Sequence, residues 1–435
     1  MHSKSTQSER GYAQHMDAQD PLRSFRQAFH LPAHGGLNAV YFCGNSLGLQ
    51  PKSVASALGE ELQQWQELAV EGWFQGKRPW LYYHKYLQEP LAGIVGAGQE
   101  EVIVMNTLTV NLHLLMVSFY RPTLSRYKII MEAGAFPSDQ YAIASQVRFH
   151  GFDPETAIVE VKPRPGEICL HTEDILRVIE EQGAGTALVL FGGVNYYTGQ
   201  YFDLQAITRA AHQVGAYAGF DLAHAVGNVR LQLHDWEVDF AAWCSYKYLN
   251  SGPGGPGGAF IHARHADRPE LPRFAGWWGQ KEETRFLMQR NFDPIHGAAG
   301  WQVSTAQVLS FAAHRVGLEL FAQVGMQQLR TKSELLTDLL YRQLDRLRQT
   351  YGHYFTILTP DKKAERGCQV SIYLPKNGRR LFDHLSGHGV ICDWREDNLF
   401  HSGGGVIRLA PVPMYNTFEE VYHFTLLLEE YFKLA

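Results

Sequence analysis

One lysine of the chain stands in surroundings that suit amine chemistry. Lys247 lies between two tyrosines, after the apolar run 240–244 and before the glycine-rich stretch 252–258. Partial burial favours the neutral form of an amine, which is the form that attacks a carbonyl carbon and makes a Schiff base. The plain alternative is a lysine on a surface loop, as most lysines are, but the core-like run before Lys247 fits that alternative poorly.

An aspartate and a histidine precede this lysine at the end of an expected strand. Asp221 and His224 both belong to the run Gly219-Phe-Asp-Leu-Ala-His-Ala. An aspartate paired with the nitrogen of a pyridoxal phosphate ring keeps that nitrogen protonated, so the ring acts as an electron sink. Taken singly, Asp221 reads as a strand-end cap and His224 as a structural histidine. Together with Lys247 they favour a Schiff-base enzyme that acts on an amino acid, with pyridoxal 5'-phosphate as its cofactor.

Two further positions suit the binding of anionic groups. The segment from Thr107 to Thr109 reads as a turn and the first turn of a helix, where hydroxyls and free backbone N–H groups bind phosphate. Ordinary capping of a helix by either threonine explains the same pattern. Arg408 stands inside an apolar strand, where a fixed guanidinium would hold a substrate carboxylate in bidentate fashion. An internal ion pair with an aspartate or glutamate is an equal alternative for Arg408.

Composition excludes several classes of function. The 435 residues carry a net charge of -5 and no basic stripe, so we expect a small-molecule substrate and neither nucleic acid nor membrane as a partner. Residues 1–19 lack the apolar core of a signal peptide, and no stretch is long and apolar enough to span a bilayer. The five scattered cysteines show no zinc-like spacing and suit a reducing cytosol. We therefore expect a cytoplasmic protein without a metal site.

Alternating strands and helices position these residues. Asp203 is a good N-cap for a helix that Gly215 ends, and this helix joins two expected strands. Strand, helix and strand at this spacing form a right-handed βαβ unit and a mostly parallel sheet, which predicts an α/β fold. The expected strands cover residues 128–131, 186–191, 216–221 and 238–243. An earlier helix carries an apolar stripe of Val54, Leu58, Leu62 and Trp65.

Ligands of such sheets bind beyond the carboxyl ends of the strands. The loop at Phe136, Asp221 and Lys247 all fall at or beyond strand ends. After residue 301 come long helices and two more expected strands, which predict a second, smaller α/β domain. The expected division is an N-terminal arm over 1–40, a large cofactor-binding domain over 41–310 and a small C-terminal domain over 311–435. We also consider that the N-terminal helix of the large domain packs on the small one.

Several blocks of the sequence, in the same order, resemble one family. Nearly end to end, the chain resembles the kynureninases, pyridoxal-phosphate enzymes of fold type I, the aspartate-aminotransferase-like fold. The resemblance implies hydrolysis of L-kynurenine to anthranilate and L-alanine in tryptophan degradation and NAD biosynthesis, and many members also act on 3-hydroxykynurenine. The most specific blocks are Asn106-Thr-Leu-Thr-Val-Asn-Leu-His-Leu-Leu, Phe136-Pro-Ser-Asp, Tyr197-Thr-Gly-Gln, Gly219-Phe-Asp-Leu-Ala-His-Ala-Val-Gly-Asn and Cys244-Ser-Tyr-Lys-Tyr-Leu-Asn.

The same resemblance implies a role for each site residue. Lys247 is the Schiff-base lysine, Asp221 pairs with the ring nitrogen, and Tyr246 relays protons. Arg408 holds the substrate α-carboxylate. The residues implied around the cofactor and its phosphate are Leu108, Thr109, Phe136, Pro137, Ser138, Asp139, His224 and Tyr246, with Phe136 stacked on the ring.

Two cofactor-contacting positions, Trp277 and Thr305, come from the neighbouring subunit in this family, which implies a homodimer with shared active sites. Trp73 and Trp277 are implied to enclose the aminophenyl ring of the substrate. Thr305 stands where other members have asparagine, and Trp73 where others have histidine. A flat apolar wall with one small hydroxyl favours plain L-kynurenine over its 3-hydroxy form. Gly192 stands where some relatives have a serine near the cofactor.

Two other classes of function stay open at this point. One is another enzyme on the same fold, such as an aminotransferase or a cysteine desulfurase. A desulfurase needs a catalytic cysteine in a mobile loop, and Cys368 is a weak candidate because the adjoining residues 370–374 look like a strand. The other class is a non-catalytic binding scaffold, against which the joint presence of Lys247, Asp221 and Arg408 argues.

Overall fold

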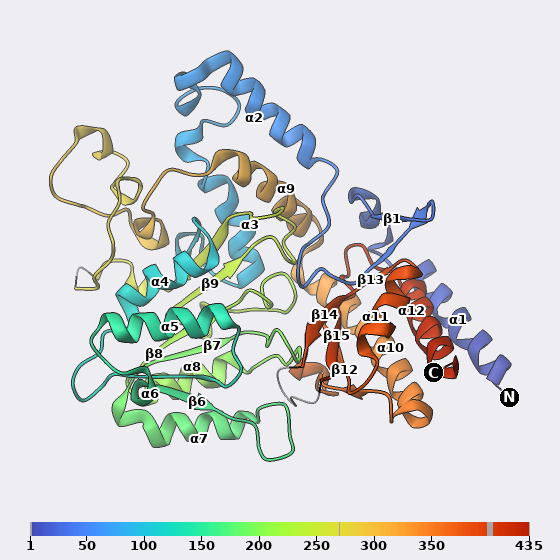
Figure 1. Ribbon diagram of the computed structural model, residues 1–435. Coiled ribbons are helices and arrows are strands. Elements are labelled where there is room, and N and C mark those ends of the chain that lie inside the picture. The colour runs from blue at the N-terminus through green and yellow to red at the C-terminus, as the bar shows by residue number, and fades with distance from the viewer. Residues whose placement is uncertain (1, 269, 398–402, 435) are drawn as a thin grey trace. The chain divides into compact units, whose positions relative to one another are not determined.

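The computed structural model describes residues 2–268, 270–397 and 403–434 (Figure 1). Its contacts divide the chain into two compact units. The first is made of Met1–Lys52, Tyr196–Tyr201 and Val324–Ala435, and the second of Ser53–Asn195 and Phe202–Gln323. The domain boundaries that we expected from the sequence stay a prediction.

The second unit is built around a seven-stranded sheet with the order β4-β10-β9-β8-β7-β5-β6. Neighbouring strands run parallel except at β10, which is antiparallel to both β4 and β9. The predicted α/β class with a mostly parallel sheet is therefore confirmed. The strands are β4 Val102–Val104, β5 Lys128–Glu132, β6 Ile158–Val161, β7 Thr186–Gly192, β8 Tyr217–Asp221, β9 Phe240–Cys244 and β10 Gly257–Ile261.

Helices cover this sheet because its strands are apolar on both faces, as strands of a parallel sheet usually are. Helices α4 (Leu108–Phe119) and α5 (Pro137–Phe149) share a core with alternate strand residues such as Leu188 and Leu190. The intervening Val189 is equally buried, so the other face of the sheet is covered too. Helices α7 (Thr172–Gln182) and α8 (Leu204–Gln213) pack against β6, β7 and β8. The short α6 is Pro154–Ala157.

The predicted limits of α8 are confirmed. The Asp203 side chain accepts a hydrogen bond from the backbone N–H of Ala206, which satisfies one of the free donors at the helix start. Gly215, with a φ of 72°, ends the helical segment and leads into β8. The turn expected after Lys247 is present as well, since Gly252 and Gly254 have φ values of 89° and 64°.

Three more helices of the second unit are α2 (Val54–Leu68), α3 (Lys85–Val95) and α9 (Val308–Val324). In α2 only the first half of the apolar stripe noted in the sequence, Val54 and Leu58, packs in a core cluster. Its buried face carries Val54, Ala57, Glu61 and Gln64, whereas Leu62 and Trp65 are 49% and 60% exposed. Glu61 is buried because its carboxylate accepts hydrogen bonds from the indole of Trp80 and the phenol of Tyr83. The exposed half of the stripe is thus left for another partner.

The first unit contains a four-stranded antiparallel sheet with the order β11-β12-β15-β14. Helices α10, α11 and α12 share one hydrophobic core with its central strands. The bounds of these elements are β11 Thr356–Ile357, β12 Val370–Leu374, β14 Asp393–Glu396, β15 Gly405–Leu409, α10 Met326–Tyr351, α11 Gly378–Gly387 and α12 Phe418–Leu434. Short strands β13 Val390–Ile391 and β3 Val40–Tyr41 pair in parallel, and β1 Ala33–His34 pairs with β2 Leu37–Asn38.

The N-terminal helix α1 (His2–Gln19) is tied to the C-terminal helix α12. The carboxylate of Asp17 accepts hydrogen bonds from the backbone N–H groups of Phe418 and Glu419, at 2.8 and 2.9 Å. These are free donors of the first turn of α12, where a negative charge is also favoured by the helix dipole. The first and last helices of the described chain therefore belong to one packed body.

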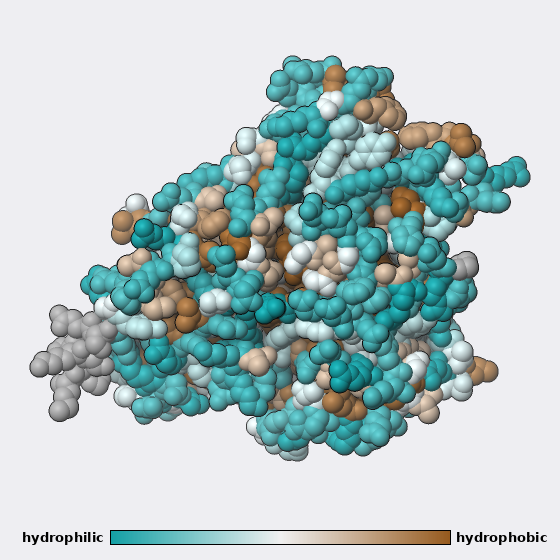
Figure 2. Space-filling view, turned by 180° about the vertical axis from the view of Figure 1, so that it is seen from behind, coloured by the Kyte–Doolittle hydropathy of each residue, from teal (hydrophilic) through white to brown (hydrophobic). Residues whose placement is uncertain are grey.

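The exposed surface is mainly hydrophilic on the face drawn in Figure 2, with hydrophobic residues in small groups. Among the described residues, none of the helices is both long enough and apolar enough to cross a membrane.

Candidate active site

The carboxyl ends of the parallel strands gather the residues proposed for chemistry. Asp221 is the last residue of β8, and Lys247 follows the end of β9 by three residues. Helix α4 begins at Leu108 after β4, and α5 begins at Pro137 after β5. Because these strands run in the same direction, all four segments meet at one edge of the sheet.

Lys247 contacts His224 directly. Its Nζ lies 3.0 Å from His224 Nε2 and 6.0 Å from the centre of the Tyr246 ring. The side chain of Lys247 is half-buried, while Tyr248 beside it is buried. This distance is within hydrogen-bond range, and which of the two nitrogens donates depends on the tautomer of His224.

Three buried carboxyl groups lie together near this lysine. The carboxyl groups of Asp139 and Asp221 interact, and Asp221 Oδ1 accepts the backbone N–H of Ala223 at 2.7 Å. Burial, and then the charge of Asp221, raises the pKa of Asp139. Asp139 therefore loses its proton less readily than a carboxyl group in water does. Burial, opposed by the N–H of Gly192 and aided by the charge of Asp221, raises the pKa of Glu132 from 4.5 to about 7.

Glu132 explains why the chain has a glycine at position 192. Both oxygens of Glu132 accept the N–H of Gly192, at 3.2 and 3.0 Å. A Cβ atom on residue 192 would meet Glu132 Oε1 at 2.8 Å, closer than real Cβ contacts come. A side chain at this position would need Glu132 to move.

Two helix starts lie beside the carboxyl cluster. Thr109, in the first turn of α4, lies with its Oγ1 2.8 Å from the Oγ of Ser138 in the first turn of α5. Free backbone N–H groups at two helix starts, with two hydroxyls between them, suit a phosphate group. Phe136 occupies the N-cap position of α5, beside this pair of helix starts, and is 45% exposed.

These residues fit the cofactor that the sequence favours. Asp139 Oδ1 and Ser245 Oγ are buried without a hydrogen-bond partner among the described residues. Such atoms are rare in a native structure unless a ligand or water completes them. Asp221, with Asp139 behind it, would hold the ring nitrogen, Lys247 the aldehyde carbon, and the first turns of α4 and α5 the phosphate. Burial raises the pKa of the Tyr246 phenol well above neutrality, so Tyr246 is a proton donor rather than a base.

Trp73, Thr305 and Trp277 belong to a second group in the same unit. Trp73 and Thr305 line one cavity of about 570 Å³ together with Trp65 and Trp80. The Trp73 ring is 5.8 Å from that of Trp80. Trp277 is 46% exposed and lies outside that lining, with its indole N–H donating to a backbone carbonyl at 3.0 Å. Its connection to Trp73 runs through Trp278, 5.7 Å from each ring.

Arg408 belongs to the first unit and is 1% exposed. Its Nη2 donates to Asp393 Oδ2 at 2.7 Å and its Nε to Oδ1 at 3.3 Å. Nη1 donates to the carbonyl of Tyr196 at 2.7 Å, and Nη2 also reaches Ser46 Oγ at 3.2 Å. The internal ion pair that was the open alternative is thus present. These contacts fix the plane of the guanidinium and use four of its five N–H groups.

Sequence reasoning missed two of these groups, Glu132 and Asp393. Glu132 is the last residue of an apolar strand. A charged residue at the end of such a strand is the only feature of the local sequence that could have marked Glu132 as a site residue. Asp393 meets Arg408 through the register of β14 and β15, which no local pattern reveals. Cys368, the candidate of the desulfurase alternative, is 1% exposed and next to β12, so it does not lie in an open loop.

Comparison with known proteins first defines a class. A profile of the class-V aminotransferases matches residues 40–378. An apo cysteine desulfurase from Thermococcus onnurineus NA1 has the same fold, with a TM-score of 0.73, 18% identity, and 91% of this chain and 95% of that chain covered. A C-DES variant with glycine covalently linked to its PLP cofactor gives 0.74 at 17% identity over 91% and 97%. The fold and the site define a pyridoxal-phosphate-dependent enzyme of the class-V aminotransferase fold.

Closer relatives then define the family. A profile of the kynureninase C-terminal domain matches residues 329–428. Kynureninase from Flavobacterium psychrophilum is 54% identical over 96% of this chain and 97% of its own length. The kynureninases from Myxococcus xanthus and Stenotrophomonas maltophilia are 53% and 51% identical, each over at least 95% of both chains. The chain belongs to the kynureninase family, which confirms the resemblance seen in its sequence.

The raised pKa of Glu132 predicts a pH-dependent stability effect. The folded protein keeps a proton on Glu132 up to about pH 7, whereas the unfolded chain loses it near pH 4.5. The free energy of unfolding therefore decreases as the pH rises from about 4.5 to about 7. The difference between these two pKa values corresponds to roughly 3 kcal/mol of unfolding free energy. Glu132→Gln should therefore stabilise the cofactor-free protein relative to wild type at pH 8, and little below pH 5, in urea unfolding. Glu160→Gln, at an exposed position of neighbouring β6, is the control. An equal effect of Glu132→Gln at both pH values would contradict this account.

Proposed function

We propose that this protein hydrolyses L-kynurenine to anthranilate and L-alanine with pyridoxal 5'-phosphate as its cofactor. The observation that carries the proposal is the placement of Lys247, Asp221 and Asp139 at one edge of the sheet, in a chain of the kynureninase family. Buried Cys368 disfavours a desulfurase. The lysine with its acidic partners disfavours a non-catalytic scaffold.

The bound cofactor supplies an electron sink that stabilises negative charge on the carbon atoms of the substrate. Lys247 would hold the cofactor, and its free amine would move the proton of the substrate α-carbon. His224, 3.0 Å from Nζ, limits where the amine can lie. Asp221, with the raised-pKa carboxyl group of Asp139 beside it, would pair with the ring nitrogen.

The hydrolysis balances with one water molecule. The oxygen of water adds to the side-chain ketone carbon, and the bond from that carbon to Cβ breaks. The ketone carbon leaves as the carboxylate of anthranilate, and Cβ takes a proton to become the methyl group of alanine. Tyr246, whose raised pKa keeps its phenol protonated, is placed near Lys247 and supplies that proton.

Substrate binding uses two separate groups of residues. Arg408 holds the α-carboxylate through the one N–H group that its contacts with Asp393, Tyr196 and Ser46 do not use, and those contacts set its orientation. The cavity that contains Trp73 and Thr305 receives the aminophenyl ring. Its aromatic wall and single small hydroxyl favour plain L-kynurenine over the 3-hydroxy form.

The active form is proposed to be a homodimer with shared sites. The exposed half of the α2 stripe continues into Val70 and Phe74, which are 67% and 54% exposed. Monomeric proteins rarely leave large apolar groups open together. Trp277, also exposed, joins Phe74 through the ring of Phe286, 5.5 Å from the first and 5.9 Å from the second. A second copy covering this surface would bring Trp277 to the site of its partner.

A cytoplasmic location is proposed on chemical grounds. The five cysteines, all within the described residues, form no disulfide, which suits a reducing compartment.

The reaction can be tested by the fluorescence of anthranilate. Purified protein supplied with pyridoxal phosphate should release anthranilate from L-kynurenine, with a higher kcat/KM than for 3-hydroxykynurenine. Asp221→Asn should keep the fold but lose most of the activity, because an amide does not hold a pyridinium proton as a carboxylate does. Asp203→Asn is the matched control, since asparagine caps a helix as well as aspartate. Near-normal turnover of Asp221→Asn would make Asp221 a capping residue only.

The role of Arg408 can be tested with a neighbouring arginine as control. Losing one partner of a buried, charge-assisted pair costs on the order of 2–5 kcal/mol. Arg408→Ala should therefore reduce kcat/KM for L-kynurenine roughly 30-fold or more, with the cofactor content unchanged. Arg395→Ala removes an exposed arginine that also contacts Asp393 at 3.2 Å, and should have little effect. Equal kcat/KM for Arg408→Ala and wild type would mean that the carboxylate is held elsewhere.

Shared sites predict that two inactive variants restore each other. Lys247→Ala and Trp277→Ala should each be weak in activity. In a mixed dimer, one site combines the intact lysine of one subunit with the intact tryptophan of the other. Co-expression should thus recover about one quarter of the wild-type activity, because half of random dimers are mixed and each has one intact site. A sum of the two separate activities, with a monomeric mass in light scattering, would contradict the shared dimer.

A further inference from the structure

A second group of ligand-type side chains lies at the other edge of the large sheet. Glu101 directly precedes β4, and His262 directly follows β10. Since Phe260 pairs with Val102 in antiparallel register, these two residues lie at the same edge. That edge is where β9 begins, because Ile261 pairs with its first residue. The group is therefore separated from Lys247 by the length of the strands.

Glu101 is held in place by the backbone. It is fully buried, and its two oxygens accept the N–H groups of Ala263 at 2.7 Å and Gly98 at 2.8 Å. Each oxygen keeps a further lone pair, and both lie within 3.0 Å of His234 Nδ1. The carboxylate is thus fixed and ionised, since its hydrogen bonds with His234, Ala263 and Gly98 outweigh burial and lower its pKa.

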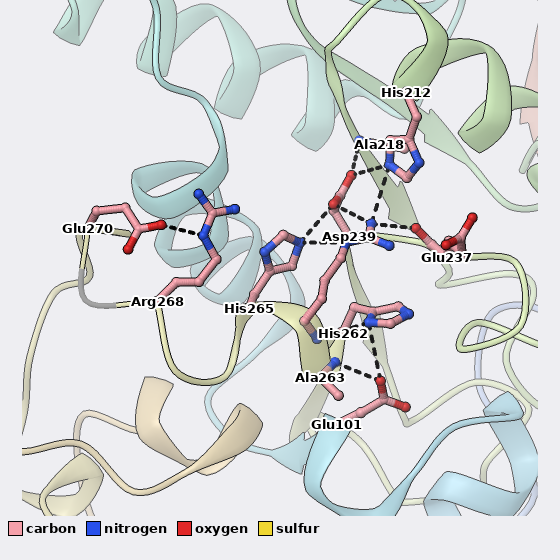
Figure 3. Close-up of polar contacts among 11 residues, drawn as sticks. Glu101, His212, Ala218, Glu237, Asp239, His262, Ala263, His265, Arg268 and Glu270 are labelled. Atoms are coloured by element: carbon pink, nitrogen blue, oxygen red, sulfur yellow. Dashed lines mark hydrogen bonds and ion pairs between the residues drawn. The ribbon is translucent and has the colours of Figure 1, made fainter.

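The two histidines complete the group. His262 Nδ1 accepts the N–H of Arg264 at 3.1 Å and lies 3.7 Å from Glu101 Oε1 (Figure 3). The His234 ring stacks on that of His262 with centroids 4.9 Å apart. One ligand atom from each of the three residues lies within 4.8 Å of the other two. The His234 side chain is half exposed, so its ring can turn, while Glu101 stays anchored by its backbone donors. For His262 to bind a metal, its ring must exchange the hydrogen bond from the N–H of Arg264 for a bond to the ion.

We propose that Glu101, His234 and His262 form a binding site for a divalent transition metal ion of the Zn²⁺ type. Two imidazoles and one carboxylate are common ligands of Zn²⁺, with bonds of about 2.0–2.2 Å and a water in the fourth position. Metal bonds of that length need the three ligand atoms to lie closer together than 4.8 Å. A turn of the exposed His234 ring would move its nitrogen nearer to the other two ligand atoms. The metal takes the place of the proton that His234 shares with Glu101.

The neighbouring acid–histidine cluster shows what distinguishes the proposed site. Asp239 accepts from His212, His265 and the guanidinium of Arg264, as well as from the N–H of Ala218 (Figure 3). A permanent cation already occupies that carboxylate, and a second cation there would be repelled. Glu101 instead faces the imidazoles of His234 and His262 and two backbone N–H groups, none of which is a permanent cation.

The site joins three separate parts of the second unit. Glu101 belongs to the segment before β4 and His262 to the end of β10, while His234 lies in the connection between β8 and β9. A metal there would stabilise the folded state by mass action and leave turnover unchanged, because it lies at the edge away from Lys247. Its effect is therefore independent of the proposed reaction. The lack of zinc-like cysteine spacing led us to expect no metal site. This group could not be found from spacing, because Glu101 and His234 are 133 residues apart.

The test uses the chelator-treated holoenzyme and Zn²⁺ itself. Equilibrium dialysis should find about one tight Zn²⁺ per chain, and Zn²⁺ should raise the melting temperature by a few degrees. His234→Ala should weaken binding by about tenfold or more, since even the loss of an outer partner of a ligand costs 10–100-fold. It should also abolish the thermal shift and leave cofactor content and turnover unchanged. His423→Ala, which removes another exposed histidine, should bind as wild type.

Either of two results would overturn the proposal. One is equal Zn²⁺ binding by wild type and His234→Ala, which would place the metal elsewhere. The other is the absence of a Zn²⁺-dependent thermal shift in wild type. Co²⁺ gives an independent readout, because its visible absorption reports tetrahedral imidazole and carboxylate ligands and should be lost in Glu101→Gln.

Discussion

The site of the second unit depends on placing three acids in one buried location. Burial raises the pKa of Glu132 and of Asp139, and the nearby charge of Asp221 raises both further. The chain thus places two carboxyl groups that hold their protons more tightly than usual beside Asp221. The sheet makes the arrangement achievable, because the ends of β5 and β8 and the start of α5 meet at the same edge. Lys247, with His224 against its amine, is added from the end of β9.

Much of this edge follows from local patterns in the sequence. Apolar runs of strand length, joined by a helix with Asp203 at its start and Gly215 at its end, predict parallel strands, and those strands exist. Asp221 and Lys247 could be placed because each lies at or just beyond a strand end. Glu132 could not be assigned, because its role comes from the N–H of Gly192, sixty residues away in the chain. Asp393 could not be predicted for the same reason, because it lies opposite Arg408 only through the register of two paired strands.

Helix α2 shows a limit of prediction from periodicity. The spacing of Val54, Leu58, Leu62 and Trp65 places them on one face of a helix. Apolar residues on such a face can pack against the core of their own chain or against another protein molecule. The pattern does not say which residues face the core of their own chain. Here the buried face includes Glu61, a charged residue held by Trp80 and Tyr83, while Trp65 is open. Burial of a glutamate and exposure of a tryptophan on one helix are the reverse of what composition alone suggests.

The contact between Asp17 and the start of α12 has a consequence for the order in which the protein acquires its structure. The second unit is almost continuous along the chain, with only Tyr196–Tyr201 belonging elsewhere. The first unit combines segments from both sides of it, and α1 finds its partner only after α12 has been synthesised. During translation the large sheet can form before α12, the helix that Asp17 of α1 caps, has been made. Closure of the first unit is then the late step, and it carries the entropy cost of joining chain ends separated by an entire folded body.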